Sequence, residues 1–208
     1  MSLPRSSPLP LINPADQPAA KATKVCTSHE FSAEERSILL RLAHDAILSA
    51  LDYRDISLEP PTPHLAQPRG AFTSLYLHGQ LRGCVGYVLP ASSVYRTVAE
   101  TARAAAFEDT RFCAVTRDEA PELKIELSIL SPPQPIAAEA VEVGHHGLFI
   151  SKHGQRGLLL PQVPVEHGWD RITFLEQTCR KAGLPRDAWQ KGANLEAFTA
   201  EVFGEKEL

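Results

Sequence analysis

The fold is decided around residues 71–89, which read AFTSLYLHGQLRGCVGYVL. Apolar, aromatic and β-branched residues flank the turn His78-Gly79-Gln80, an arrangement typical of two strands joined in a hairpin. We therefore expect antiparallel strands over Ala71–Leu77 and Leu81–Leu89. A further strand is predicted at residues 123–129, where four apolar residues alternate with three polar ones, as in a strand with one buried face.

Helices are predicted before and after the hairpin in the sequence. Ser32 and Glu35 have the spacing of a capping box and open an amphipathic helix that continues to Leu51. An alanine-rich helix follows over Ser92–Phe107, with Ser92 or Ser93 as its cap. Thr116 and Glu119 form a second capping-box pattern, which Pro121 interrupts.

The second half of the chain repeats this alternation of strands and helices. Strands are expected at 147–151 and 156–161, a helix after the cap residue Asp170, and a last strand over Ala197–Phe203. The segment SPPQP at 131–135 reads as a rigid linker and a boundary between two lobes.

Composition narrows the class of protein. The chain has 208 residues, and its 21 Lys and Arg against 25 Asp and Glu give a net charge of −4. This balance argues against a surface built wholly to bind a polyanion, so nucleic-acid binding is disfavoured but stays open through a local basic patch. No apolar run is long enough for a transmembrane helix, and the start of the chain lacks a signal peptide's apolar core, so we expect a cytoplasmic protein that does not enter membranes.

Two further features bear on organisation and compartment. Residues 1–28 carry five prolines among small and polar residues, so we expect a disordered extension ahead of a domain at 29–204. The four cysteines are far apart, which favours free thiols in a reducing compartment. No Cys or His spacing indicates a zinc site or any other metal site.

The segment Leu81–Gly86 carries the chemical interest of the sequence. On a regular strand Arg82, Cys84 and Gly86 share one face, so a guanidinium and a thiol become neighbours. Gly83 and Gly86 leave room for a ligand or for another backbone. A nearby cation favours the reactive thiolate, although a free cysteine commonly only packs, and both interpretations of Cys84 stay open.

The sequence resembles the AMMECR family, also called AmmeMemoRadiSam system protein A. Leu81–Gly86 matches the family hexapeptide L-R-G-C-I-G except for Val85. Further blocks match in the same order over about residues 29–204, at 104–109 with 111–112, 121–133, 157–163, 168–170, 174–175, 179–185 and Trp189.

The resemblance implies an α+β fold with mixed or antiparallel sheets and packed helices, in two subdomains with a cleft between them and the hexapeptide near that cleft. It also implies association with a Memo-like protein and a radical SAM protein. It brings no established catalytic activity, and neither the residues nor the resemblance identifies a cofactor.

Three residues are candidates for catalysis. Cys84 is a candidate nucleophile or redox thiol. Arg82 is either a ligand for an anion through its guanidinium fork or a partner in a salt bridge to Glu126, Glu108 or Asp109. Glu126 either orients Arg82 or is simply solvated.

The candidates for ligand binding are Arg82, Gly83, Gly86, Glu108, Asp109 and Arg111. The last three follow a helix end, where they either line a cleft or form an ordinary charged turn. The first hypothesis is an enzyme or enzyme accessory that binds a small anionic ligand beside Arg82 and Cys84. The alternatives are a non-catalytic module that binds a partner protein and a role connected with nucleic acid.

Overall fold

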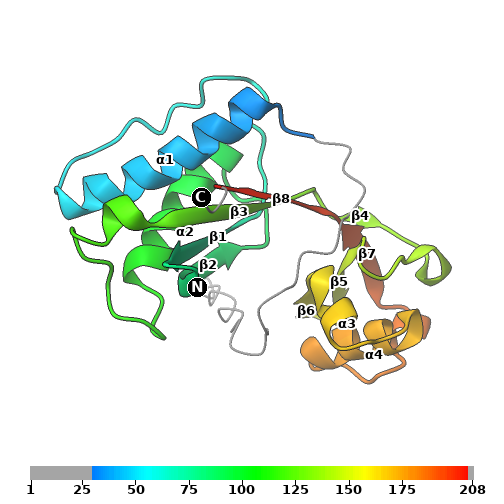
Figure 1. Cartoon of the computed structure of the whole chain (residues 1–208). Coiled ribbons are helices and arrows are strands. Elements are labelled where there is room, and N and C mark those ends of the chain that lie inside the picture. The colour runs from blue at the N-terminus through cyan, green and yellow to red at the C-terminus, as the bar shows by residue number, and fades with distance from the viewer. Residues whose placement is uncertain (1–29, 206–208) are drawn as a thin grey trace, which may run out of the picture.

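The computed structural model describes residues 30–205, which form two lobes, each built on a four-stranded antiparallel sheet (Figure 1). The first sheet has the strand order β2-β1-β3-β8 and the second the order β4-β7-β5-β6. The expected α+β fold class is thereby confirmed. The extension expected at residues 1–28 lies outside the described residues.

The elements of the first lobe are α1 (Ala33–Leu51), β1 (Ala71–Leu77), β2 (Gln80–Tyr87), α2 (Val94–Phe107), β3 (Lys124–Leu130) and β8 (Ala200–Gly204). Those of the second lobe are β4 (Gln134–Pro135), β5 (Gly147–Lys152), β6 (Gln155–Leu159), α3 (Gln162–Glu166), α4 (Arg171–Lys181) and β7 (Asn194–Phe198). Short 3-10 turns occur at Ala120–Glu122, Ala138–Ala140 and Ala188–Gln190.

The helix starts agree with the cap residues in the sequence. The Ser32 hydroxyl accepts a hydrogen bond from the Glu35 N–H, and the Glu35 carboxylate accepts one from the Ser32 N–H, so the capping box at the start of α1 is complete. Ser93 caps α2 and Asp170 caps α4 in the same way, each satisfying a backbone N–H that has no partner within the helix.

Helices α1 and α2 cover one face of the first sheet (Figure 1). Their close approach depends on small residues. Gly83 on β2 faces Ala105 of α2, and a Cβ at position 83 would overlap the Ala105 carbonyl oxygen. The opposite face of this sheet is not covered by α1 or α2, and we call it the open face.

The chain crosses between the lobes twice, once from β3 to β4 and once from β7 to β8. The two crossings hold each other, because Ser131 donates its N–H to the Thr199 carbonyl at 2.9 Å and the Thr199 N–H donates to the Ser131 hydroxyl at 3.0 Å. The single last strand expected over Ala197–Phe203 is wrong. Its two halves pair with different sheets, so the strand is divided at Thr199.

An apolar cluster joins the lobes around these crossings. Phe72 and Leu130 of the first lobe pack with Leu158, Leu160 and Phe198 of the second. Both tryptophans are partly buried in the second lobe, and Trp169 also packs against the cluster that joins the lobes. No helix within residues 30–205 has the length and apolar character needed to cross a membrane.

Candidate functional site

Three side chains from neighbouring strands form a row across the open face. Ser74 on β1 lies directly opposite Cys84 on β2 and, on its other side, directly opposite Glu126 on β3. The Ser74 hydroxyl donates a hydrogen bond to the Cys84 sulfur at 3.3 Å. Residues that pair directly across antiparallel strands present their side chains on the same face, so a thiol, a hydroxyl and a carboxyl are aligned here.

The row faces away from the helices. The neighbouring residue Thr73 points the other way and its hydroxyl meets that of Thr101 on α2 at 2.8 Å. Because side chains alternate along a strand, Ser74 must point to the open face. Cys84 and Glu126 are half-buried there, which leaves them accessible but partly shielded from water.

Burial changes the acid–base behaviour of the row. Burial raises the pKa of the Glu126 carboxyl, although a hydrogen bond with Tyr76 works in the opposite direction. Burial also raises the pKa of the Cys84 thiol, against the hydrogen bond from Ser74 and the positive charge of Arg111. The thiol is therefore mostly protonated at neutral pH and needs a proton acceptor to react, and a carboxyl with a raised pKa is suited to that task.

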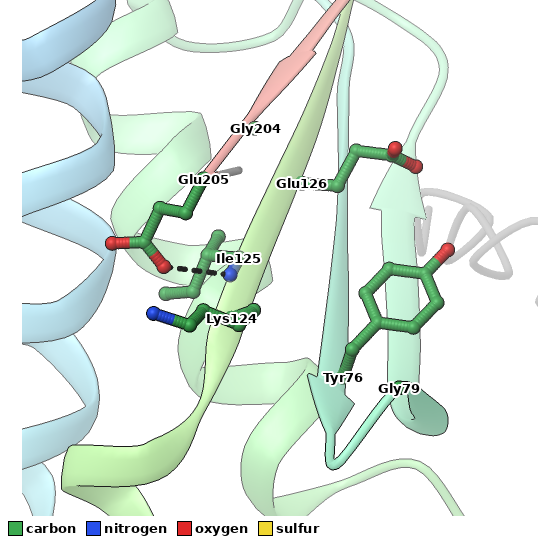
Figure 2. Close-up of a pocket in the computed structure, with 7 residues that line it drawn as sticks. All are labelled: Tyr76, Gly79, Lys124, Ile125, Glu126, Gly204 and Glu205. Atoms are coloured by element: carbon green, nitrogen blue, oxygen red, sulfur yellow. Dashed lines mark hydrogen bonds between the residues drawn. The ribbon is translucent and has the colours of Figure 1, made fainter. Parts of the chain in front are cut away.

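A pocket of about 230 Å³ adjoins the row at Glu126 and is lined by Tyr76, Gly79, Lys124, Ile125, Glu126, Gly204 and Glu205. Figure 2 shows Tyr76 and Glu126 to one side of β3 and Lys124 and Glu205 to the other. Cys84 does not line this pocket, since β1 lies between β2 and β3.

Of the charged groups that line the pocket, Glu205 already has partners within the protein and Lys124 is without an ion pair among the described residues. The Glu205 carboxylate accepts a hydrogen bond from the Ile125 N–H at 3.0 Å and contacts Nε2 of His44 at 3.0 Å. The Lys124 ammonium group has no ion pair with any other residue in the range 30–205. Lys124 is therefore the pocket cation that is left for a ligand.

Arg82 lies apart from Cys84, contrary to the expectation that they share a face. The pairing of β1 with β2 shifts between Leu75 and Tyr76, so that Arg82 is an extra residue in a β-bulge. Its guanidinium binds both carboxylate oxygens of Glu119, at 3.0 and 3.1 Å, and the carbonyls of Cys113 and Ala114.

This engagement makes Arg82 a cross-link between β2 and the segment after α2. The bound guanidinium and the Thr116 N–H lower the pKa of Glu119 to about 2. The Arg82 donors are bound to Glu119 and to backbone carbonyls, so of the two alternatives for Glu126 the one in which it orients Arg82 is wrong. The capping-box pattern of Thr116 and Glu119 does form, since each residue's N–H donates to the other's side chain.

Asp109 and Arg111 bind the backbone of Cys84. The Cys84 N–H donates to Asp109 at 2.9 Å, and Arg111 donates to the Cys84 carbonyl at 3.3 Å. The two side chains also form an ion pair at 2.6 Å. The third candidate of this segment, Glu108, is exposed at the end of α2.

The two glycines of the hexapeptide leave no open space beside them. The room at Gly83 is filled by the backbone of α2, and a Cβ at Gly86 would overlap the ring of Phe72. Of the two uses expected for these glycines, the approach of another backbone is found at Gly83, whereas Gly86 accommodates the side chain of Phe72, which neither expectation named.

Three residues of this region were not singled out by the sequence. Ser74, Tyr76 and Lys124 join Cys84 and Glu126 only once the strand order is known. A signal was present in AFTSLYL, where Ser74 and Tyr76 occupy alternate positions of one predicted strand. Of the cysteines in residues 30–205, Cys84 is half-buried, Cys113 exposed and Cys179 buried, and all three are free. Within the same range no three His, Cys, Asp or Glu side chains are grouped to hold a metal ion.

Comparison with known proteins defines the class of protein to which this fold and open face belong. The AMMECR1 family model matches residues 40–203, and the chain belongs to that family. "Protein MK0488" of Methanopyrus kandleri is 41% identical over 191 residues, which cover 86% of this chain and 92% of the relative. A protein of Aquifex aeolicus is 38% identical over 179 residues, covering 81% of this chain and 92% of its own.

A solved structure shares the fold. The crystal structure of uncharacterized protein PH0010 from Pyrococcus horikoshii matches with a TM-score of 0.67 and 38% identity, over 81% of this chain and 90% of that one. The resemblance to the AMMECR family expected from the hexapeptide is thereby confirmed.

Proposed function

We propose that this AMMECR1-family protein binds a small ligand on the open face of the first sheet and that the Cys84 thiol reacts with it. The observation that carries the proposal is the row of Cys84, Ser74 and Glu126 across three strands. A nucleophilic thiol needs a base that can take its proton, and this row supplies a carboxyl on the same face, one strand beyond the Ser74 hydroxyl.

The roles of the three groups follow from their chemistry. Cys84 is the nucleophile and Glu126 is the final acceptor of its proton. The Ser74 hydroxyl lies between them, 3.3 Å from the sulfur, and passes the proton on by accepting it from the thiol while giving its own to Glu126. The Tyr76 hydroxyl beside Glu126 provides a further hydrogen bond to the site. Arg82 keeps a structural role, because its donors are bound to Glu119 and to backbone carbonyls.

The proposed ligand is small and carries an anionic group. The adjoining pocket of about 230 Å³ limits its size. An anionic group would meet Lys124 rather than Arg82, since Arg82 and Arg111 are each paired with a carboxylate. A compact metabolite with one negative charge and a carbonyl group fits these conditions. The sulfur forms a bond to the carbonyl carbon, the C=O π bond breaks, and the carbonyl oxygen takes up the proton that Glu126 received from the thiol.

The test is alkylation of Cys84 by iodoacetamide as a function of pH in the wild type and in Glu126→Gln. A general-base role predicts that the variant reacts several-fold more slowly below the thiol midpoint, because no group takes the proton. A purely electrostatic role predicts the reverse, because the negative charge of Glu126 disfavours the thiolate. Faster or unchanged alkylation would therefore refute the role of Glu126, and a Cys84 that reacts only on unfolding would refute the site.

Two controls belong to this experiment. Glu122→Gln makes the same change at an exposed position and should leave the rate unchanged. Cys113, which is exposed in the same chain, provides an internal reference for the intrinsic reactivity of the reagent. Replacing iodoacetamide by the anionic iodoacetate tests the charge of the ligand. We expect iodoacetate to be favoured at Cys84 relative to Cys113 and that preference to disappear in Lys124→Gln.

A further inference from the structure

At Cys84, the backbone groups on the outer edge of β2 are hydrogen-bonded to side chains from the segment after α2 and not to another strand. β2 is an edge strand, and the Cys84–Ser74 pair leaves the N–H and C=O of Cys84 directed away from β1. Asp109 accepts from that N–H and Arg111 donates to that carbonyl. Together they replace the two hydrogen bonds that a neighbouring strand would make.

These two residues form a rigid unit, which we call the edge clamp. Arg111 donates to the two Asp109 carboxylate oxygens at 2.9 and 2.6 Å, and the Arg111 N–H binds the same carboxylate at 3.2 Å. The Asp109 side chain is only 6% exposed and that of Arg111 is 22% exposed. A bidentate pair with this little freedom fixes the geometry of what it holds.

We propose that Asp109 and Arg111 are positioning residues for Cys84: they hold its backbone so that the thiol faces Ser74, and their opposite charges act in opposite directions on its reactivity. The inference rests on the proposed function of Cys84 but makes its own measurable claim. The hexapeptide suggested Arg82 as the positive charge that favours the Cys84 thiolate. The inference assigns that role to Arg111 instead.

The electrostatic surroundings of the sulfur support this assignment. The groups that face Cys84 are Ser74 and Tyr76 from β1, Glu126 from β3, and Asp109 and Arg111 from the segment after α2. Among them Arg111 lowers the pKa of the thiol, while Asp109 and Glu126 raise it. Arg82 directs its charge to Glu119 instead.

The experiment measures the pH midpoint of Cys84 alkylation by iodoacetamide, resolved by peptide mass spectrometry, in single variants of the full chain. Arg111→Gln should raise the midpoint by about 0.5 to 1 pH unit, because a positive charge near the thiol is lost. Asp109→Asn should lower it by a similar amount, while the amide oxygen still accepts from the Cys84 N–H. Shifts of opposite sign are the signature, since a merely structural clamp would change both variants in the same way.

Two matched variants complete the test. Arg111→Lys keeps the positive charge but not the planar guanidinium, so its midpoint should lie much closer to that of the wild type than the midpoint of Arg111→Gln does. Arg82→Gln loosens the same segment at its other attachment and should leave the midpoint unchanged. Equal midpoints in all variants, or shifts of the same sign in Arg111→Gln and Asp109→Asn, would overturn the proposal.

Failure of the clamp and failure of the proposed function can be told apart. If the clamp is wrong, Glu126→Gln still slows alkylation while the Asp109 and Arg111 variants do not move the midpoint. If Glu126 is not the base, the clamp variants still shift the midpoint in opposite directions. Should Arg111→Gln fail to fold, Asp109→Asn still tests the charge effect, because a lowered midpoint is expected and an unchanged or raised midpoint would overturn the proposal.

Discussion

The residues of the hexapeptide divide three tasks among neighbouring positions. Gly83 allows α2 to approach β2, Arg82 ties the bulge to the segment after α2, and Cys84 contributes its thiol to the open face. Each task depends on an atom outside the hexapeptide: a carbonyl of Ala105, a carboxylate of Glu119 and a hydroxyl of Ser74. The motif is thus a meeting point of three elements, and Cys84 is the residue through which it adds a reactive group to the open face.

The glycines of the hexapeptide should differ in their tolerance of alanine. Gly83→Ala forces a methyl group against the backbone of α2, which cannot rotate away, and should lower the free energy of unfolding by about 3 kcal/mol. Gly86→Ala meets Cγ and Cδ1 of Phe72, so relief requires a new χ1 rotamer of that side chain but no shift of a helix backbone, and the substitution should cost about 1 kcal/mol less. Urea denaturation of both variants checks the order, and equal costs would contradict it.

The ion pair of Arg82 with Glu119 makes stability depend on pH. The folded pKa of Glu119 is about 2 against an ordinary 4.5, so its contribution is complete above about pH 4.5 and is lost as the pH falls towards 2. We expect Arg82→Gln to lower the free energy of unfolding by about 1 to 3 kcal/mol at pH 7. Urea denaturation at pH 7 and pH 3 should show this difference shrinking at the lower pH, and a constant difference would argue against the pair as its source.

At the scale of elements, the two faces of the first sheet differ: one packs against helices and the other carries the candidate site. The face towards α1 and α2 carries the core, and the Thr73–Thr101 hydrogen bond is a buried polar contact within it. The open face carries the row of Cys84, Ser74 and Glu126. The fixed packing of the first face holds the strands in the register on which the second depends.

The hydrogen bond between β1 and α2 can be tested by removing one hydroxyl at a time. Thr101→Val leaves the buried Thr73 hydroxyl without its partner and should cost about 1 to 3 kcal/mol of unfolding free energy. Thr73→Val should cost less, because the Thr101 hydroxyl keeps its bond to the Thr97 carbonyl at 2.9 Å. Thermal unfolding of the two variants measures this difference, and the reverse order would show that relaxation or water satisfies Thr73.

At the scale of the whole molecule, two chain crossings and one apolar cluster join the lobes. Ser131 and Thr199 bind each other at the crossings, and Phe198 is 2% exposed in the cluster that contains Phe72. The core of each lobe is otherwise its own. The cluster should therefore govern how strongly the unfolding of the two lobes is coupled.

Phe198→Ala tests this coupling. Removing the ring should lower the free energy of unfolding by about 3 to 5 kcal/mol and weaken the contact between the lobes. Trp169 and Trp189 both lie in the second lobe, so their fluorescence follows the unfolding of that lobe. Trp169 also packs against the cluster that contains Phe198, so the signal of the folded variant is expected to differ from that of the wild type. We expect the fluorescence transition in urea to precede the far-UV circular dichroism transition in the variant, while the exposed control Val143→Ala behaves as the wild type. Coincident transitions in Phe198→Ala would contradict this.

The sequence by itself determined most of the elements, because their signals are local, although it did not reveal that the last strand is divided between two sheets. The capping box of Ser32 and Glu35, the alternation in β3 and the turn at Gly79 involve residues only a few positions apart. The same local reasoning identified Cys84 and Glu126 as candidates of chemical interest. The family resemblance followed from the order of short blocks, which also needs no third dimension.

Only the tertiary structure decided which of these residues meet. A single β-bulge turned Arg82 from Cys84 to Glu119, and the strand order β2-β1-β3 inserted Ser74 between the thiol and Glu126. Arg111 reached Cys84 from 27 positions away along the chain. Side chains alternate between the two faces of a strand only as long as no bulge adds a residue. Which distant strands pair is set by the packing of the whole core and not by neighbours in sequence.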